Sequence, residues 1–278
     1  MNLLLDALGW LFSPERLDGS NPLPRGVLIH LAYTFGAVAI AAAVAVPLGW
    51  LIGHTGRGRE LAVAASGAAR AIPSFGLILL LVLLLGVARK PEAAMIAFVL
   101  LAIPSILAGA YTGLEAIDRR TIDAGRAMGM TEWQVLWRIE APLGLPLLVG
   151  GLRSAVLQVV ATVTLAAYVN LGGLGYDIIQ GIQLRRFEQV LGGALIVAVL
   201  ALVLDGLFAL LQRASQPAGA PEPAPRRGRG SRDPAPRDVA SRDTPARHSA
   251  TADARHPDAA GVTPTDPRTP MHTTKAES

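Results

Sequence analysis

The chain has 278 residues, 51% of them apolar, and a formal net charge of +4. This composition is too apolar for an ordinary soluble domain of this size, and it predicts an all-α integral membrane protein. Cysteine is absent and the five histidines lack metal-ligand spacing, which excludes disulfide scaffolds and thiol nucleophiles and predicts no metal site.

Residues 1–26 open with MNLLLDALGWLF, followed by a proline-rich link. Asp6 stands where a secretory signal would carry basic residues, so we do not expect a signal peptide. Leucines in this stretch fall on one helical face beside Trp10. We therefore interpret residues 1–26 as a segment at the membrane interface.

About five transmembrane helices are expected between residues 27 and 213. Crossing about 30 Å of hydrocarbon takes roughly 20 residues. Four apolar stretches are long enough, at residues 27–53, 93–114, 143–169 and 190–211.

The remaining apolar block, residues 61–87, is interrupted by Arg70 and by the sequence Ile-Pro-Ser at 72–74. We expect Pro73 to break this helix and to leave residues 74–87 as the purely apolar span. A broken helix at membrane depth is tolerated where it lines a cavity. Pro73 and Ser74 are therefore candidates for lining a translocation path, with an ordinary kink as the alternative.

Polar side chains inside the later spans have two interpretations each. Gln158 and Thr162 either line a translocation path or form hydrogen bonds between helices. Arg153 lies near the start of its span, which suggests that it reaches to the near interface. Asp205 is either a functional intramembrane carboxylate or a helix-end group close to Arg213.

The longest charged interruption of the apolar sequence is residues 118–142, DRRTIDAGRAMGMTEWQVLWRIEAP. Asp118 is suited to cap a first helix that ends at Gly129 in a left-handed turn. Thr131 and Gln134 form the pattern of a capping box for a second helix, which we expect Pro142 to close. Apolar residues at helical spacing make this arm either a docking surface or an element packed on its own membrane domain.

Residues 214–278 are rich in Pro, Ala, Arg and Asp and have few large apolar residues. We expect a disordered tail, which could contact anionic membrane lipid through its arginines. Loop charges favour the arm and the C-terminus in the cytoplasm and the N-terminus outside. The placement of basic residues does not suggest nucleic acid as a partner.

The arm resembles a known pattern, the EAA loop of ABC importer permeases, E-A-A-x3-G-x9-I-x-L-P. Six of the residues at the positions of this pattern are Asp123, Ala124, Gly125, Gly129, Ile139 and Pro142. Asp123, Gly125 and Ala141 differ from it in residue type. Further stretches at 72–86, 102–118 and 171–195 resemble the osmoprotectant subgroup, the permeases for glycine betaine, choline and carnitine. The resemblance covers residues 27–213.

The resemblance implies a type I ABC importer permease in the bacterial inner membrane, a transport subunit and not an enzyme. The six matching residues would form the contact with a pair of cytoplasmic ATP-binding subunits. The chain has no G-x-x-x-x-G-K-[ST] sequence, so ATP and Mg²⁺ are expected on those partners and no cofactor on this chain. A second permease, identical or related, and an extracytoplasmic substrate-binding protein would complete the importer.

Other functions remain open from the residues alone. The same machine could carry another small solute, such as an amino acid or a sulfonate. An ion-coupled secondary transporter is encouraged only by Asp205 and Arg70, and it leaves the arm unexplained. No paired carboxylates or nucleophile–base set favours a membrane enzyme.

Overall fold

The computed structural model describes residues 3–14, 16 and 22–216, and every regular element within them is a helix. Most of the predicted tail, from residue 217 onward, and parts of the predicted interfacial segment lie outside the described residues. The elements are α1 (Leu3–Leu11), α3 (Leu23–Thr55), α4 (Arg59–Ala71), α5 (Ser74–Leu85), η1 (Val87–Arg89), α6 (Lys90–Glu115), α7 (Arg119–Ala127), α8 (Glu132–Val135), η2 (Leu136–Glu140), α9 (Ala141–Leu165), η3 (Ala166–Val169), α10 (Gly175–Leu184) and α11 (Phe187–Ala214).

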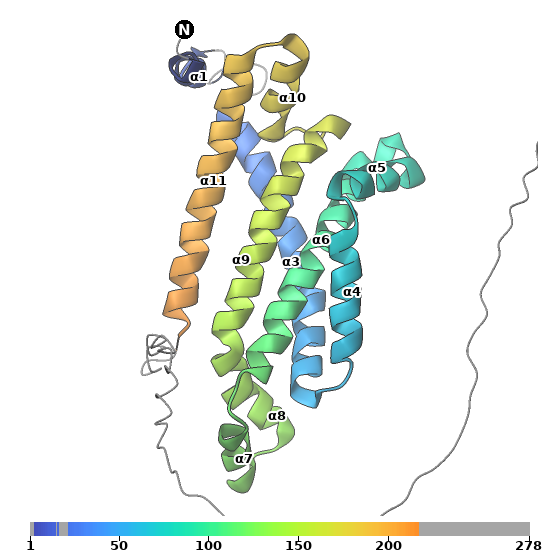
Figure 1. Cartoon of the computed structure of the whole chain (residues 1–278), viewed down its shortest axis with the longest axis vertical. Helices are drawn as coiled ribbons and strands as arrows, with labels where there is room; N and C mark the ends of the chain where they lie inside the picture. The colour runs from blue at the N-terminus through green and yellow to red at the C-terminus, as the bar shows by residue number, and fades with distance from the viewer. Residues whose placement is uncertain (1–2, 15, 17–21, 217–278) are drawn as a thin grey trace, which may run out of the picture. The chain divides into compact units, whose positions relative to one another are not determined.

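The membrane-crossing helices agree with the expectation of about five spans. Within the described residues, four helical runs are long and apolar enough to cross a membrane, and α4 with α5 supplies a fifth crossing if the two count as one. The four runs lie side by side in Figure 1, with α7 and α8 at one end and α1 and α10 at the other. The all-α membrane fold predicted from composition is confirmed.

The prediction that residues 74–87 form a span of their own is wrong. Helix α5 has 12 residues, which at 1.5 Å per residue is about 18 Å and too short for the hydrocarbon layer. Pro73 interrupts the helix, and α4 and α5 meet there at a bend of 85°. The second apolar block is therefore a bent helix pair, in which α4 runs along the bundle and α5 turns away from it (Figure 1).

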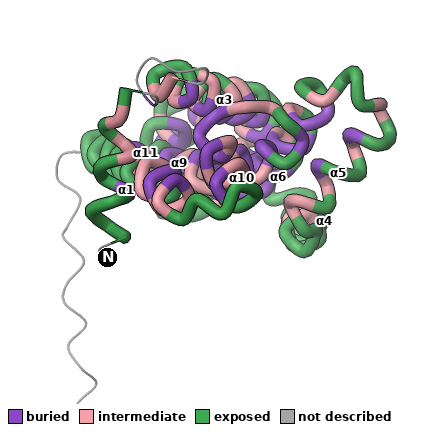
Figure 2. The backbone as a smooth tube through the Cα atoms, turned by 90° about the horizontal axis from the view of Figure 1, so that it is seen from above, coloured by how far each residue is buried: buried purple, intermediate pink, exposed green. Residues whose placement is uncertain are grey.

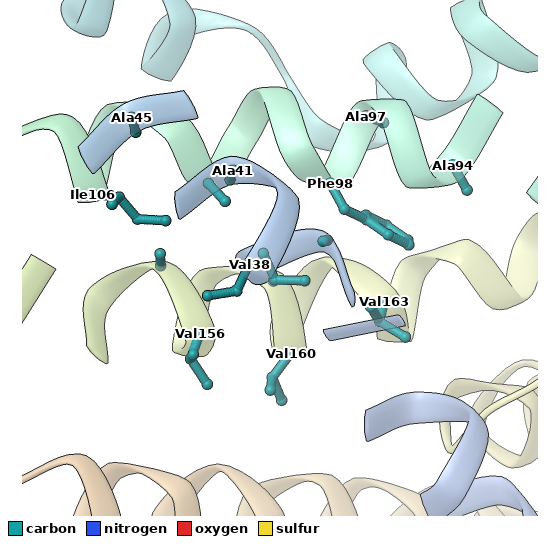
Figure 3. Packing of buried hydrophobic residues seen from close by; sticks show 14 of the residues in the cluster. Val38, Ala41, Ala45, Ala94, Ala97, Phe98, Ile106, Val156, Val160 and Val163 are labelled. Atoms are coloured by element: carbon teal, nitrogen blue, oxygen red, sulfur yellow. The ribbon is translucent and has the colours of Figure 1, made fainter. Parts of the chain in front are cut away.

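The core of the subunit lies between α3, α6 and α9, and most of its side chains are small. Figure 3 shows Val38 and Ala41 of α3 with Phe98 and Ile106 of α6 in the space between α6 and α9. Burial decreases from the centre of the bundle outward (Figure 2). In the apolar stretch of α6, 61% of the residues are buried, against 6% in that of α11. Helix α6 is thus the centre of the subunit, and most of α11 is free to face lipid or another subunit.

Glycines bring the three central helices into backbone contact near the end that carries α7 and α8. A Cβ on Gly53 of α3 would come within 2.8 Å of the Leu114 Cβ on α6. On the other side of α6, a Cβ on Gly109 would lie 2.8 Å from the Cα of Gly151 on α9. Small residues at helix contacts allow the close approach on which packing in membranes depends. This half of the bundle is therefore tightly joined.

Candidate functional site

The first helix of the arm, α7, begins and ends at the residues that the sequence indicated. The Asp118 carboxylate accepts a hydrogen bond from the Arg120 backbone N–H at 3.0 Å and so caps the helix. Asp123 and Ala124 are exposed on α7, whereas Gly125 is buried against the second half of the arm.

Gly129 forms the turn between the two halves of the arm. Its φ of 83° lies in the left-handed region. The Gly129 N–H donates to the Arg126 carbonyl at 2.9 Å, and the Met130 N–H donates to the Gly125 carbonyl at 3.2 Å. These two bonds make a Schellman turn, the helix ending that favours glycine at this position.

The second helix starts with the predicted capping box. The Thr131 hydroxyl accepts from the Gln134 backbone N–H, and the Gln134 side chain accepts from the Thr131 backbone N–H. The two halves are also tied together by Arg126, whose guanidinium donates to both Glu132 carboxylate oxygens at 2.8 Å. This hydrogen bonding raises the pKa of Arg126 above its usual value.

Apolar residues of the arm divide into an inner and an outer set. Val135 is buried and Ile139 is partly buried between the two halves, so the arm packs in part on itself. Met128 and Trp133 point away, with 77% and 68% of their surfaces exposed. The arm thus packs in part on itself and leaves part of its apolar surface exposed, and we call Met128 and Trp133 its apolar tip.

The prediction that Pro142 closes the second helix is wrong, because one helical run continues from Glu132 to Val169 and joins the arm to the fourth span. Residues 136–140 form a π turn, in which the Ala141 N–H donates to the Leu136 carbonyl five residues back. Pro142 follows at the start of α9. The wider turn accommodates a residue that lacks an N–H and would collide with an ordinary preceding turn.

Two contacts between α3 and the arm were not predicted from the sequence. His54 Nδ1 lies 2.6 Å from Glu140 Oε2, and the rings of Trp50 and Trp137 meet edge to face with centroids 5.3 Å apart. Glu140 is 3% exposed. Since 86 positions separate His54 from Glu140, no local spacing could reveal this pair.

The four candidate path residues fall into two groups that lie apart along the chain. Pro73 and Ser74 are at the break between α4 and α5, where the Phe75 ring lies 5.2 Å from the Tyr168 ring of η3. Gln158 and Thr162 are on α9. The Ser105 hydroxyl donates to Gln158 Oε1 at 3.3 Å, and the buried Thr162 hydroxyl donates to the Gln158 carbonyl at 2.8 Å.

Arg153 and Asp205 pair with each other, which corrects both sequence interpretations. The Arg153 guanidinium donates to both Asp205 oxygens at 2.6 Å, from α9 to α11. Each side chain is about one-third exposed. The carboxylate is therefore a bridge between two spans, and neither group is explained by the nearest helix end.

A second ion pair lies at the end of the bundle opposite the arm. Arg16 Nη2 is 2.6 Å from Asp177 Oδ2, and the two side chains are 2% and 5% exposed. Burial raises the pKa of Asp177 to about 6, and the neighbouring Arg16 charge offsets part of that rise. Burial likewise lowers the pKa of Arg16. The pair ties the N-terminal residues to α10.

The chain is similar in sequence to known transport proteins. The family described as the binding-protein-dependent transport system inner membrane component matches residues 45–216. The carnitine transport permease protein OpuCB of Listeria monocytogenes is 35% identical over 65% of this chain and 81% of its own length. The osmoprotectant import permease protein OsmW of Salmonella typhimurium is 35% identical over 73% and 96%.

A further relative and a solved structure are also similar to this chain. The glycine betaine/carnitine/choline transport system permease protein OpuCB of Bacillus subtilis is 30% identical over 68% of this chain and 87% of its own length. A chain of the MetNI methionine ABC transporter in an inward-facing conformation superposes with a TM-score of 0.61 at 23% identity, covering 70% of this chain and 96% of that one. This second likeness concerns the fold alone.

Proposed function

The chain belongs to the family of inner membrane components of binding-protein-dependent transport systems, and on that premise we propose that it is the permease subunit of an ATP-driven importer for osmoprotectants. The cargo class is the quaternary ammonium compounds, such as glycine betaine, choline and carnitine. The names of the relatives at 30–35% identity support this class. The observation that carries the permease role is the arm, a capped helix, Schellman turn and second helix with an uncovered apolar tip.

The arm is the proposed contact with the ATP-binding subunits. Asp123 and Ala124 lie exposed on α7, Gly125 lets the two halves pack together, and Gly129 sets the turn. Ile139 and Pro142 belong to the return into the fourth span, at the π turn and just after it. The exposed Met128 and Trp133 supply apolar surface that a groove on an ATPase would cover.

The proposed assembly follows from the family. Two cytoplasmic ATP-binding subunits hold Mg-ATP, two permeases enclose the path, and an extracytoplasmic binding protein delivers the solute. The arm and the C-terminus face the cytoplasm, and the N-terminus and α10 face outward. Arg57, Arg59, Arg119 and Arg120 at the arm end support this orientation.

The candidate path residues also take a place in this proposal. Residues 71–75 pass through the 85° bend, and a broken helix at membrane depth suits a surface that encloses a water-filled path. Gln158 and Thr162 lie on α9, whose polar groups already bond within the subunit. We propose that the Pro73–Ser74 break lines the path and that Gln158 and Thr162 take part from the fourth span.

The test is purification of the full chain from its native membrane, followed by reconstitution into liposomes. The proposal predicts that an ATP-binding subunit copurifies and that radiolabelled glycine betaine enters when ATP and the binding protein are supplied. Uptake of glycine betaine driven by an ion gradient without ATP would contradict it. Uptake of methionine in preference to any quaternary ammonium compound would retain the permease role and overturn the cargo class.

A further inference from the structure

His54, in the last turn of α3, contacts both ends of the second half of the arm. Its Nδ1 lies 2.6 Å from Glu140 Oε2, and its Nε2 lies 3.4 Å from Glu132 Oε2. The Glu140 side chain is 4% exposed. In the tautomer that carries its proton on Nδ1, His54 donates this short hydrogen bond and the Glu140 carboxylate accepts it. A carboxylate buried to this degree is costly without a partner, and His54 is that partner.

Trp50 reinforces this contact one turn earlier on the same helix. Residues four apart share a helix face, so Trp50 and His54 both point at the arm. The Trp50 ring meets the Trp137 ring at 90°, and Trp137 in turn packs against Trp133 of the tip with ring centroids 5.6 Å apart. We call Trp50 and His54 the α3 clasp.

The clasp contacts the π turn of the arm–span helix. Trp137 and Glu140 both belong to the π turn of residues 136–140, within the continuous run from Glu132 to Val169. Single π turns inside α-helices recur at functional sites, and they are places where a helix changes direction. The angle between the arm and the fourth span is therefore set at the π turn, where Trp50 and His54 of α3 contact it.

The clasp itself stands on a rigid support. Gly53, next to His54 in the sequence, faces α6, where an added Cβ would lie 2.8 Å from Leu114 Cβ and 2.9 Å from the Tyr111 carbonyl. Helix α6 contacts α9 with the same closeness at Gly113 and Gly144. A displacement of Glu140 would therefore act on α3 through His54, and on α6 through the close contact at Gly53. It would also act directly along α9, which follows Glu140 in the sequence.

We propose that His54 is a positioning residue for energy coupling: by holding Glu140 it fixes the angle of the arm, so that movement of the arm on the ATPase is transmitted to α3 and α6. This inference rests on the proposed function of the arm. It differs from a merely stabilising role in one measurable respect. Loss of the contact should leave ATP hydrolysis in place and reduce the solute moved per ATP.

The experiment uses the full importer, with permease, ATPase and binding protein, reconstituted into liposomes. Uptake of radiolabelled glycine betaine and release of phosphate are measured together, and their ratio is compared among variants. The variants are His54→Ala, Glu140→Ala and the two combined, with His54→Asn as the conservative replacement, since its amide nitrogen can donate in place of Nδ1. The matched control is Arg57→Ala, an exposed residue three positions further along the chain, just after α3.

Each single alanine variant is expected to lower the solute-to-ATP ratio about tenfold, the effect of losing a hydrogen bond to a charged group. The double variant should be no worse than either single one, because both remove the same contact. His54→Asn should recover most of the ratio, and Arg57→Ala should match the wild type. Copurified ATPase should be unchanged throughout.

An unchanged ratio in His54→Ala would overturn the inference, as would a parallel fall in uptake and hydrolysis or a loss of copurified ATPase. Failure of the wild-type complex to bind an ATPase or to take up glycine betaine would instead overturn the proposed function. The two failures are therefore distinguishable.

Discussion

Gly125 of α7 lies directly against Ile139 of the π turn: a Cβ on residue 125 would come within 2.5 Å of the Ile139 Cδ1. This contact closes the two halves of the arm on each other. The EAA pattern has alanine where this chain has Gly125. Substitutions at this position therefore test how much space lies between the two halves of the arm. The atom in the way is the far end of a flexible side chain.

We predict that Gly125→Ala is tolerated and that Gly125→Leu is not. Ile139 can rotate away from one methyl group, and alanine favours the helix by up to about 1 kcal/mol relative to glycine. Leucine would force the halves of the arm apart. The measurement is the melting temperature of the purified permease together with the amount of copurified ATPase. Equal damage from alanine and leucine would contradict the contact.

The Arg153–Asp205 pair predicts a dependence of stability on charge balance. Asp205→Asn or Arg153→Gln should lower the melting temperature by several degrees, because each leaves one charge between spans without its partner. Exchanging the two residues, Arg153→Asp with Asp205→Arg, should restore part of the loss. If the single and exchanged variants melt alike, the pair does not join α9 to α11.

The buried Asp177 predicts a pH dependence. Its pKa of about 6 lies above the ordinary 3.8, so between those values the folded state holds a proton that the unfolded state has lost. Stability contributed by this group therefore falls as the pH rises from about 4 to about 6 and is level above that. Plots of melting temperature against pH for the wild type and Asp177→Asn, from pH 4 to 7.5, should differ in slope only within this window. Parallel plots would refute the raised pKa of Asp177.

Residues beyond Gln216 are predicted to be dispensable for transport. Helix α11 ends at Ala214, and the family match ends at residue 216. A chain cut after Gln216 should assemble and take up glycine betaine at nearly the wild-type rate in the same liposomes. Loss of assembly on truncation would assign the tail a role that its composition does not suggest.

Local signals account for the part of the arm that the sequence predicted correctly. Asp118, Gly129 and the Thr131–Gln134 box each act over five positions or fewer, so their side chains and dihedral angles determine the local structure. Long apolar runs likewise determine spans, since only helices satisfy the backbone inside a bilayer. The number and approximate extent of the spans follow from these rules.

Features that depend on contacts between distant residues were not predictable from the sequence. Pro142 was expected to end a helix, yet the π turn before it lets the helix continue into α9. Asp205 was expected to be either a functional carboxylate or a helix-end group, because its partner, Arg153, lies 52 positions away in the sequence. The partner of His54, Glu140, lies 86 positions away, so no local spacing indicates this contact. In each case packing of separate helices decides the role.

Cross-linking of the arm tip tests the central claim most directly. The chain has no cysteine, so Met128→Cys introduces a single reactive thiol at the tip, and Leu184→Cys on α10 at the opposite end serves as the control (Figure 1). With a cysteine-to-amine cross-linker on the assembled importer, the account predicts a permease–ATPase adduct for Met128→Cys and none for Leu184→Cys. An intact complex in which Met128→Cys gives no adduct would contradict the role of the arm as the site of coupling.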